Sequence, residues 1–384
     1  MRRRHRCVRV VASAWCTLAV TIVLTAGCRW LPGASDSASG PIEDNASPGA
    51  EGFPFRFQPF DTPELAELAA RERLPDVVAP GRTEFERMIR LKNWVGEQWP
   101  AGTPNPYPPW NALIILDWIR AGKTGGFCAQ FAQVFLQSLA ALGMTARYIE
   151  IGNTENPYVH YLTEVWSNDF DKWVVMDPDF NLHFERDGIP LSALEVHDAF
   201  VGGSLERVHV VLGEVRAGRS AVSRWPHQTA ELYTYLRYHL TADHLARPDA
   251  PPFERYNDMI ELVDPRVAPW EASTVTSPFP KARLTRVRTS DRASLEKKLN
   301  QTRIAVAASR PDAVVLQLEN DVLGFDHYEY RVVTPAGRAD AWQSHRQDQL
   351  TVPAATGPRT IEVRGVNQRG VPGPAAELMM AAAR

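Results

Sequence analysis

The chain has 384 residues, of which 44% are hydrophobic and 23% charged, so it is long enough for two folded domains with substantial cores. Its formal net charge is −3, a value that includes the five arginines of residues 1–27. The remainder of the chain is therefore more acidic still. Because phosphate binding requires a concentrated positive surface, this charge balance argues against nucleic acid as the main partner.

The N-terminus has the pattern of an export signal. Its arginines precede an uncharged, mostly apolar run over 10–26, which ends in the small residues Ala26 and Gly27. A basic region, an apolar region and small residues before a cleavage site predict a signal peptide at residues 1–27. Cys28 follows directly and resembles the lipidated cysteine of a bacterial lipobox. The alternative is an uncleaved membrane anchor, and either would tether an exported protein to a membrane.

Cys128 is the only cysteine expected in the exported body of the protein. Cys7 and Cys16 would leave with the signal peptide, and Cys28 would carry the lipid. Exported proteins tend to use cysteine in disulfides, but Cys128 has no partner left within the chain. It is therefore either a free, reactive thiol or an inert, buried side chain.

The body of the chain divides into a predicted linker and a mixed helix–strand domain. Residues 28–56 are rich in Ser, Gly, Pro and Ala and predict a flexible linker. Residues 57–285 are interpreted as one domain with a C-terminal extension. Periodicity within this domain predicts helices over 62–72, 83–98, 112–120, 128–142 and 229–240, and strands over 146–151, 159–167 and 172–177.

The C-terminal segment, residues 300–384, has a different pattern. Short apolar runs are separated by turn residues at 314–318, 328–333, 350–352 and 360–364. Closely spaced short strands of this kind predict a small β-sandwich, which resembles a fibronectin type III or immunoglobulin-like module.

The strongest chemical signal is the environment expected for Cys128. The segment Gly125-Gly126-Phe127-Cys128 is a glycine-rich turn that enters the helix predicted over 128–142. The unpaired N–H groups and the partial positive charge of a helix N-terminus favour a thiolate there. The backbone N–H of Cys128 is also placed to donate to an oxyanion.

A base for this thiol, and a group to orient the base, are predicted on a hairpin. His160 lies near the start of the first strand and Asp177 at the end of the second, with turn-forming residues over 167–171 between the strands. A loop centred on 168–169 would place His160 directly opposite Asp177, with Cβ atoms roughly 5 Å apart. That separation suits an imidazole–carboxylate hydrogen bond.

These segments together carry a family resemblance. Gly126-Phe127-Cys128, Leu142-Gly143-Met144-Thr145-Ala146-Arg147, Glu164-Val165-Trp166 and Trp173-Val174-Val175-Met176-Asp177-Pro178 occur in the order of the transglutaminase-like superfamily. The resemblance covers about 84–180. It implies an α+β fold with a papain/transglutaminase-like core, in which the cysteine helix packs on an antiparallel sheet. It further implies that Cys128 is the nucleophile, His160 the general base and acid, and Asp177 the orienting carboxylate in thioester chemistry.

The same resemblance bears on further site residues and on cofactors. Members of this family often use a side-chain donor upstream of the cysteine for the oxyanion. Trp94 has the matching position, with core packing as its alternative role. The calcium sites of animal members have no clear counterpart, and the aspartates over 169–179 are interpreted as turn and strand residues. We therefore expect no metal and no cofactor.

Functions of different classes fit these features. The first is an exported, lipid-anchored cysteine peptidase, amidase or acyltransferase with a protein or peptide substrate, hydrolysis being favoured over transfer. The second is a catalytically silent binding or scaffold lipoprotein on the same fold. The third is a structural envelope lipoprotein in which Cys128 is only buried. Each would reach a membrane through lipid on Cys28 and face the periplasm or the exterior. The reactivity of Cys128 separates the first from the others.

Overall fold

A computed structural model describes residues 52–154, 160–213, 215–216, 230–246, 259–267, 288–354 and 357–381. The predicted signal peptide and Cys28 lie outside these residues, as does most of the predicted linker. Within the described parts of the chain, no helix is both long and apolar enough to span a membrane.

Within the described residues, five helices precede the main sheet, and local sequence signals explain where several of them start. Pro63 is the first residue of α2 (Pro63–Arg71), a position where a missing N–H costs nothing. The side chain of Thr83 accepts from the N–H of Glu86, and that of Asn111 accepts from the N–H of Leu113, so both residues cap helix N-termini. The helices are α2 (Pro63–Arg71), α3 (Leu74–Val78), α4 (Glu84–Gly96), α5 (Ala112–Arg120) and α6 (Cys128–Ala141).

The main sheet is largely antiparallel and runs in the order β10-β9-β8-β1-β2-β3-β4-β6-β7, with β5 paired to β4. Its strands are β1 (Ala146–Gly152), β2 (His160–Ser167), β3 (Lys172–Asp177), β4 (Leu182–Arg186), β5 (Ile189–Pro190), β6 (Val208–Leu212), β7 (Val215–Arg216), β8 (Tyr235–His239), β9 (Met259–Leu262) and β10 (Arg288–Thr289). The described helices after β5 are α7 (Ala193–Val201), α10 (Arg292–Leu295) and the short 3-10 turns η1 (Leu205–Arg207), η2 (Glu231–Thr234) and η3 (His244–Ala246).

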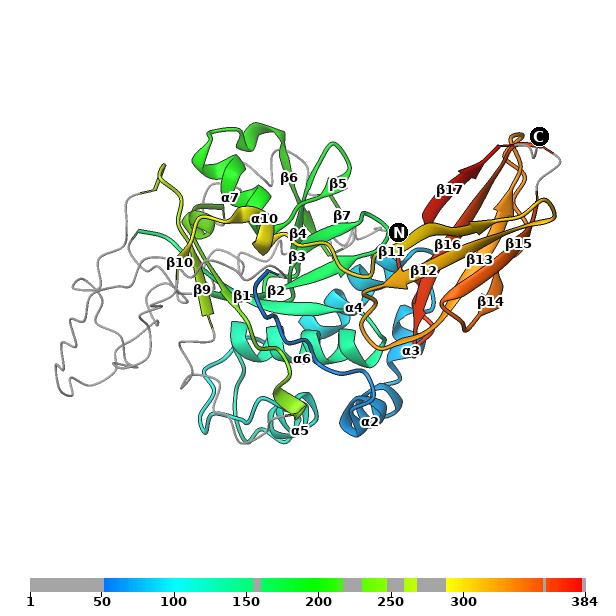
Figure 1. The fold of residues 1–384 in the computed structure, drawn as a ribbon. Coiled ribbons are helices and arrows are strands. Elements are labelled where there is room, and N and C mark those ends of the chain that lie inside the picture. Colours follow the sequence, from blue (N-terminus) through cyan, green and yellow to red (C-terminus); the bar gives the residue numbers. More distant parts are fainter. Residues whose placement is uncertain are drawn as a thin grey trace, which may run out of the picture.

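Both faces of this sheet are covered. The helices α2 to α6 lie against one face, while α7 and α10 lie on the other (Figure 1). Alternation along β1 sends Tyr148 into the core beneath the helices and Ile149 into the core beside α7. Every residue of α6 is buried, as expected for a helix that is apolar on nearly all sides.

The register of the β2–β3 hairpin corrects the sequence-based expectation. Glu164 pairs with Val175 and Ser167 with Lys172, so the loop holds four residues and the register is displaced by two from the predicted one. A displacement of two preserves the face on which each side chain lies, because side chains alternate with a period of two. His160 and Asp177 therefore remain on one face, although they are not directly opposite.

The helix predicted over 229–240 is wrong. Residues 231–234 form η2, and Tyr235–His239 is strand β8, which pairs antiparallel with β1. Aromatic residues have good strand propensity, and β1 supplies a partner far away in the sequence. Arg237 lies beside Glu150 of β1, and the two form a buried ion pair across the strands.

The C-terminal strands form two antiparallel sheets, consistent with the predicted sandwich. Three strands pair in the order β11-β12-β15 and four in the order β14-β13-β16-β17. Their inner faces enclose a separate core that includes Leu316, Tyr328 and Ile361. The strands are β11 (Thr302–Ser309), β12 (Ala313–Asn320), β13 (Phe325–Val333), β14 (Gln343–His345), β15 (Gln349–Pro353), β16 (Arg359–Asn367) and β17 (Ala376–Met380).

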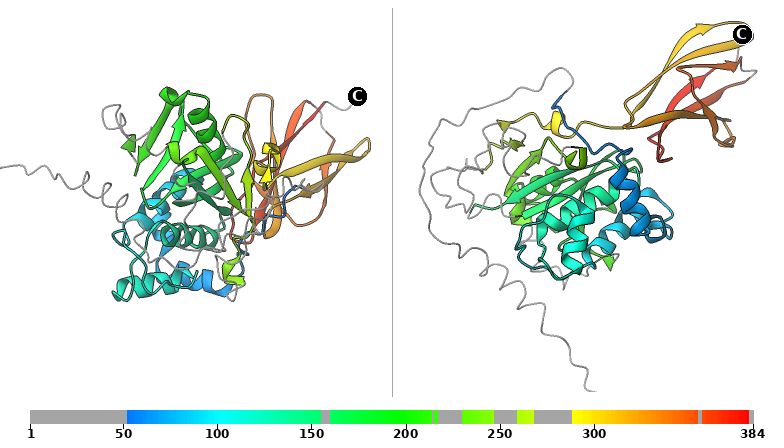
Figure 2. Two further views of the ribbon diagram at one scale, coloured as in Figure 1. Left: turned by 90° about the vertical axis from the view of Figure 1, so that its left-hand side faces the viewer. Right: turned by 90° about the horizontal axis from the view of Figure 1, so that it is seen from below.

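The sandwich projects to one side of the rest of the molecule (Figure 2). It contacts the chain just after the C-terminal end of α6, which is the end opposite to Cys128. Asn367 donates from Nδ2 to the carbonyl oxygen of Gly143 at 2.9 Å, and Arg369 donates from Nε to the carbonyl oxygen of Phe60 at 3.1 Å. Gly143 has φ +80°, and an added Cβ would lie 2.5 Å from Cβ of Arg369. Only glycine fits both this backbone conformation and the close approach of the sandwich.

We predict that Gly143→Ala destabilises the protein more than Gly122→Ala does. Gly122 has φ +66° with nothing within 4 Å of an added Cβ, so that variant isolates the cost of the left-handed backbone, about 1–2 kcal/mol. Gly143→Ala adds the clash with the sandwich. Thermal unfolding followed by circular dichroism should show the larger loss in apparent Tm for Gly143→Ala. Equal losses would contradict a tight junction at this point.

Candidate active site

Cys128 is the first residue of α6, and the turn before it is tightly held. Trp99 donates from Nε1 to the carbonyl oxygen of Gly126 at 3.3 Å, and the N–H of Gly102 donates to the same oxygen at 2.8 Å. A Cβ at Gly126 would lie 2.6 Å from Nε1 of Trp99. The glycine therefore allows the indole to support the turn, and the turn sets the direction in which the Cys128 side chain leaves the helix.

His160 and Asp177 meet at one rim of the sheet. His160 is the first residue of β2 and Asp177 the last of β3, and Nε2 lies 2.7 Å from Oδ2. The other carboxylate oxygen, Oδ1, accepts from the N–H groups of Asp179 at 3.0 Å and Phe180 at 3.1 Å. The ring of Phe180 stacks on the imidazole at 4.6 Å between centroids. Both oxygens of Asp177 are thus engaged, which orients the imidazole.

The imidazole also contacts Cys128. Sγ of Cys128, a ring nitrogen of His160 and a carboxylate oxygen of Asp179 lie within 4.8 Å of one another. Because Nε2 is bonded to Asp177, Nδ1 is the nitrogen that remains for the thiol. Burial lowers the pKa of His160, but the Asp177 charge and hydrogen bonds to Asp177 and Cys128 outweigh it and hold this pKa well above its usual range. The site therefore favours an imidazolium next to sulfur.

Asp179 is a second carboxylate at this site, and the sequence analysis interpreted it only as a turn or strand residue. Burial raises the pKa of its carboxyl to about 6, with His160 lowering it and Asp177 raising it. The sequence shows that Asp179 lies two residues after Asp177. It does not show how close Asp179 lies to Cys128, because that distance depends on how α6 packs against the sheet.

Two aromatic residues near Cys128, Trp99 and Tyr107, were not predicted from the sequence to belong to the site. Trp99 supports the turn before Cys128. Trp94, the predicted oxyanion donor, is half-buried on α4 and packs against the helical core. Trp94 as a donor stays a prediction. Tyr107 interacts electrostatically with Cys128, and its ring lies 6.2 Å from that of Phe127. Burial raises the pKa of Tyr107, so its hydroxyl keeps its proton.

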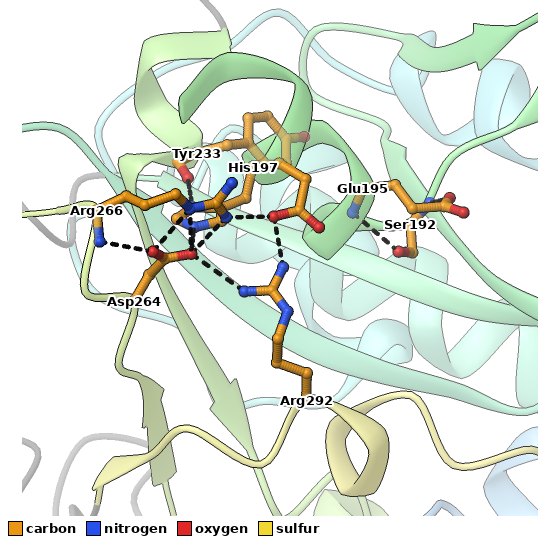
Figure 3. Close-up of polar contacts among 8 residues, drawn as sticks. Ser192, Glu195, His197, Tyr233, Asp264, Arg266 and Arg292 are labelled. Atoms are coloured by element: carbon orange, nitrogen blue, oxygen red, sulfur yellow. Dashed lines mark hydrogen bonds and ion pairs between the residues drawn. The ribbon is translucent and has the colours of Figure 1, made fainter. Parts of the chain in front are cut away.

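A second buried His–Asp contact lies elsewhere, between α7 and the segment after β9 (Figure 3). His197 contacts the carbonyl oxygen of Tyr233 through Nδ1 at 2.7 Å and Oδ2 of Asp264 through Nε2 at 3.1 Å. Hydrogen bonds from Arg266 lower the pKa of Asp264, despite burial that raises it, and Arg292 contacts the same carboxylate. These side chains join α7 to the chain that follows β9, which is a structural role.

The cluster at Cys128 defines a class of site. A thiol at a helix N-terminus, an imidazole on an antiparallel sheet and a carboxylate behind the imidazole form the arrangement of papain-like cysteine proteins. The structure brings together the three predicted residues Cys128, His160 and Asp177.

Comparison with known proteins relates the segment that contains the site to one family. The sequence model of the transglutaminase-like superfamily matches residues 71–178, which contain all three residues. This part of the chain is therefore similar to the transglutaminase-like superfamily. A solved structure of red sea bream transglutaminase is similar with 12% sequence identity and a TM-score of 0.27, covering 84% of this chain and 58% of its own. No curated protein sequence matches the chain.

We predict that Asp177→Asn moves the titration of His160 to lower pH. The amide retains an oxygen for the N–H groups of Asp179 and Phe180 but removes the negative charge that stabilises the imidazolium. NMR of ¹⁵N-labelled histidine rings, with His160 assigned by its loss in His160→Gln, measures this directly. Asp264→Asn is the matched control, since it alters the other buried His–Asp pair and should leave His160 unchanged.

The sign of the pH effect on stability follows from the same shift. Since folding raises the pKa of His160, the interaction with Asp177 stabilises the fold fully below the unfolded-state pKa of about 6.5. That contribution is lost as the pH rises through the higher folded-state value. Asp177→Asn should therefore cost more stability at pH 6 than above the folded-state pKa, and an equal cost at both would contradict a charged pair.

Proposed function

We propose that this protein is an exported, lipid-anchored cysteine enzyme that forms a thioester at Cys128 with peptide or carboxamide substrates. The observation that carries the proposal is the contact of one imidazole, His160, with both the Cys128 thiol and the Asp177 carboxylate. An imidazolium held between a thiol and a carboxylate activates sulfur as a nucleophile and then delivers a proton to the leaving group.

The acylation step follows from this arrangement. The sulfur of Cys128 attacks the carbonyl carbon, and the C=O π pair moves onto oxygen, where the N–H groups at the start of α6 can stabilise the charge. The C–N bond then breaks as the oxyanion collapses. His160 gives its proton to the departing nitrogen, so that a thioester and a free amine or ammonia result. Asp177 keeps the imidazole oriented throughout.

Hydrolysis is the favoured second step. The neutral His160 accepts a proton from water while the oxygen attacks the thioester carbon, and collapse breaks the C–S bond to give a carboxylic acid. An amine in place of water would give acyl transfer instead. Water is present at far higher concentration than any amine around an exported protein, and nothing among the described side chains forms a dedicated amine pocket.

Export and lipid attachment rest on the sequence of residues 1–28. The basic region, the apolar run and the small residues before Cys28 support a cleaved signal peptide and a lipid on that cysteine. A protein or peptide of the cell envelope is the substrate class that such a tethered enzyme would meet, in the periplasm or at the exterior.

One observation favours the alternative, a catalytically silent binding or scaffold lipoprotein. Cys128 is only 9% exposed and His160 5%, and Phe180 stacks on the imidazole. A substrate carbonyl must displace side chains to reach the sulfur, whereas a binding surface needs no such access.

We predict that Cys128 is alkylated rapidly at pH 6, where an ordinary thiol with a pKa of about 8.5 is almost entirely protonated. In the full-length protein, iodoacetamide modification of the peptide that holds Cys128 should be at least about tenfold faster than in urea-denatured protein, since His160 supplies the cation that maintains the thiolate. His160→Ala should abolish this advantage, with folding checked by circular dichroism.

The matched control is His197→Ala, which removes the other buried His–Asp contact and should leave the rate unchanged. A slow rate at every pH, unaffected by His160→Ala, would overturn the enzyme proposal. The search would then move to binding partners of the folded chain.

A further inference from the structure

Asp179 has no role in the thioester chemistry, yet it lies within 4.8 Å of both the sulfur of Cys128 and a ring nitrogen of His160. Its backbone is held in place, since its N–H donates to Oδ1 of Asp177 at 3.0 Å. Three side chains with metal-binding atoms thus converge on one point from three parts of the chain.

We propose that Cys128, His160 and Asp179 form a binding site for a divalent cation of the zinc type. A thiolate, an imidazole and a carboxylate are all zinc ligands, and three protein ligands with a fourth position open are typical of accessible zinc sites. Ligand atoms around a tetrahedral zinc are about 3.5 Å apart at bond lengths near 2.0–2.3 Å. Small side-chain rotations would close the present separations to that value.

The surroundings of the imidazole match a metal ligand as well as a base. A histidine that binds zinc through one nitrogen commonly contacts a carboxylate through the other, which fixes the ring. Nε2 of His160 contacts Asp177 at 2.7 Å, which leaves Nδ1 for a metal shared with Cys128. Asp177 would therefore orient the imidazole of His160 in the same way, whether His160 binds a metal or acts as a base.

Charge also favours a cation here. The thiolate of Cys128 and the carboxylate of Asp179 together balance a divalent ion, and binding would release the imidazolium proton of His160 to solvent. The groups that act electrostatically on Asp179 are His160 and Asp177, with no lysine or arginine among them.

A second cluster of potential ligands provides the contrast. Asp198, His197 and Asp264 also have their polar atoms within 4.8 Å of one another. There, however, the guanidinium groups of Arg266 and Arg292 contact both carboxylates, so positive charge is already supplied by the protein. At the cluster at Cys128 the described positive charge is the imidazolium of His160, whose proton a bound ion would replace.

The consequence for activity rests on the proposed function. A bound ion would occupy the sulfur lone pair and Nδ1 of His160 at once, so neither nucleophile nor base would be available. Zinc would then be a reversible inhibitor that protects the thiol from alkylation and oxidation.

The test measures zinc binding to the full-length protein by competition with a chromophoric chelator. We expect one site lost in Cys128→Ser and weakened on the order of tenfold or more in Asp179→Asn, since even partners outside the coordination sphere are worth roughly 10–100-fold. The matched control is Asp187→Asn, at an exposed aspartate with φ +52°, a conformation that asparagine tolerates; its affinity should equal that of the unmodified protein.

Alkylation of Cys128 with and without zinc gives a second readout that does not depend on turnover. Zinc should slow the modification, and should slow it less in Asp179→Asn. Zinc affinity equal in Asp179→Asn and Asp187→Asn would overturn the site, even if rapid, His160-dependent alkylation upheld the enzyme proposal. Tight, Asp179-dependent zinc binding without an activated thiol would uphold the site and overturn the enzyme.

Discussion

Complete burial of α6 is the constraint on which the rest of the core depends. The helix packs on β1 and β2 on one side and on α2, α4 and α5 on the other, so no face is left for water. Two of its glutamines bond within the core, since Gln133 and Gln137 both donate to the carbonyl oxygen of Trp110 at 3.1 Å. Because close-packed interiors resist displacement, the position of Cys128 at the start of this helix is determined by the whole core.

Local signals in the sequence were sufficient for the helices α2, α4, α5 and α6 and for the proximity of Cys128, His160 and Asp177. The glycine-rich turn, the helix that follows Cys128 and the two strands were each predicted nearly as the structure has them. The hairpin register was wrong by two residues, because loop length is not visible in a pattern that repeats every two residues. The contact of His160 with Asp177 survived this error since an even displacement preserves the face, and long side chains reach diagonal neighbours.

Features that depend on distant partners escaped prediction. Strand β8 was taken for a helix because its partner, β1, lies more than eighty residues earlier, and the aromatic run alone fits either structure. Asp179 and Trp99 come close to Cys128 only after the sheet, the loop 100–111 and α6 have packed together.

The imidazole of His160 would be protonated for thioester chemistry and neutral for metal binding. The acylating state and the metal-bound state of this site therefore compete with each other.

The junction between the sandwich and the core bears on how such a chain can be divided. The carbonyl of Gly143 receives its hydrogen bond from Asn367, and Asn300 donates to the side chain of Asn168 in the β2–β3 loop. A fragment that stopped before residue 300 would lose both hydrogen bonds and would also lack Leu323, which packs against the core that includes the helices. A boundary that looks natural in the sequence is therefore a poor place to cut, because the C-terminal sandwich, although it encloses a core of its own, also covers part of the core that includes the helices.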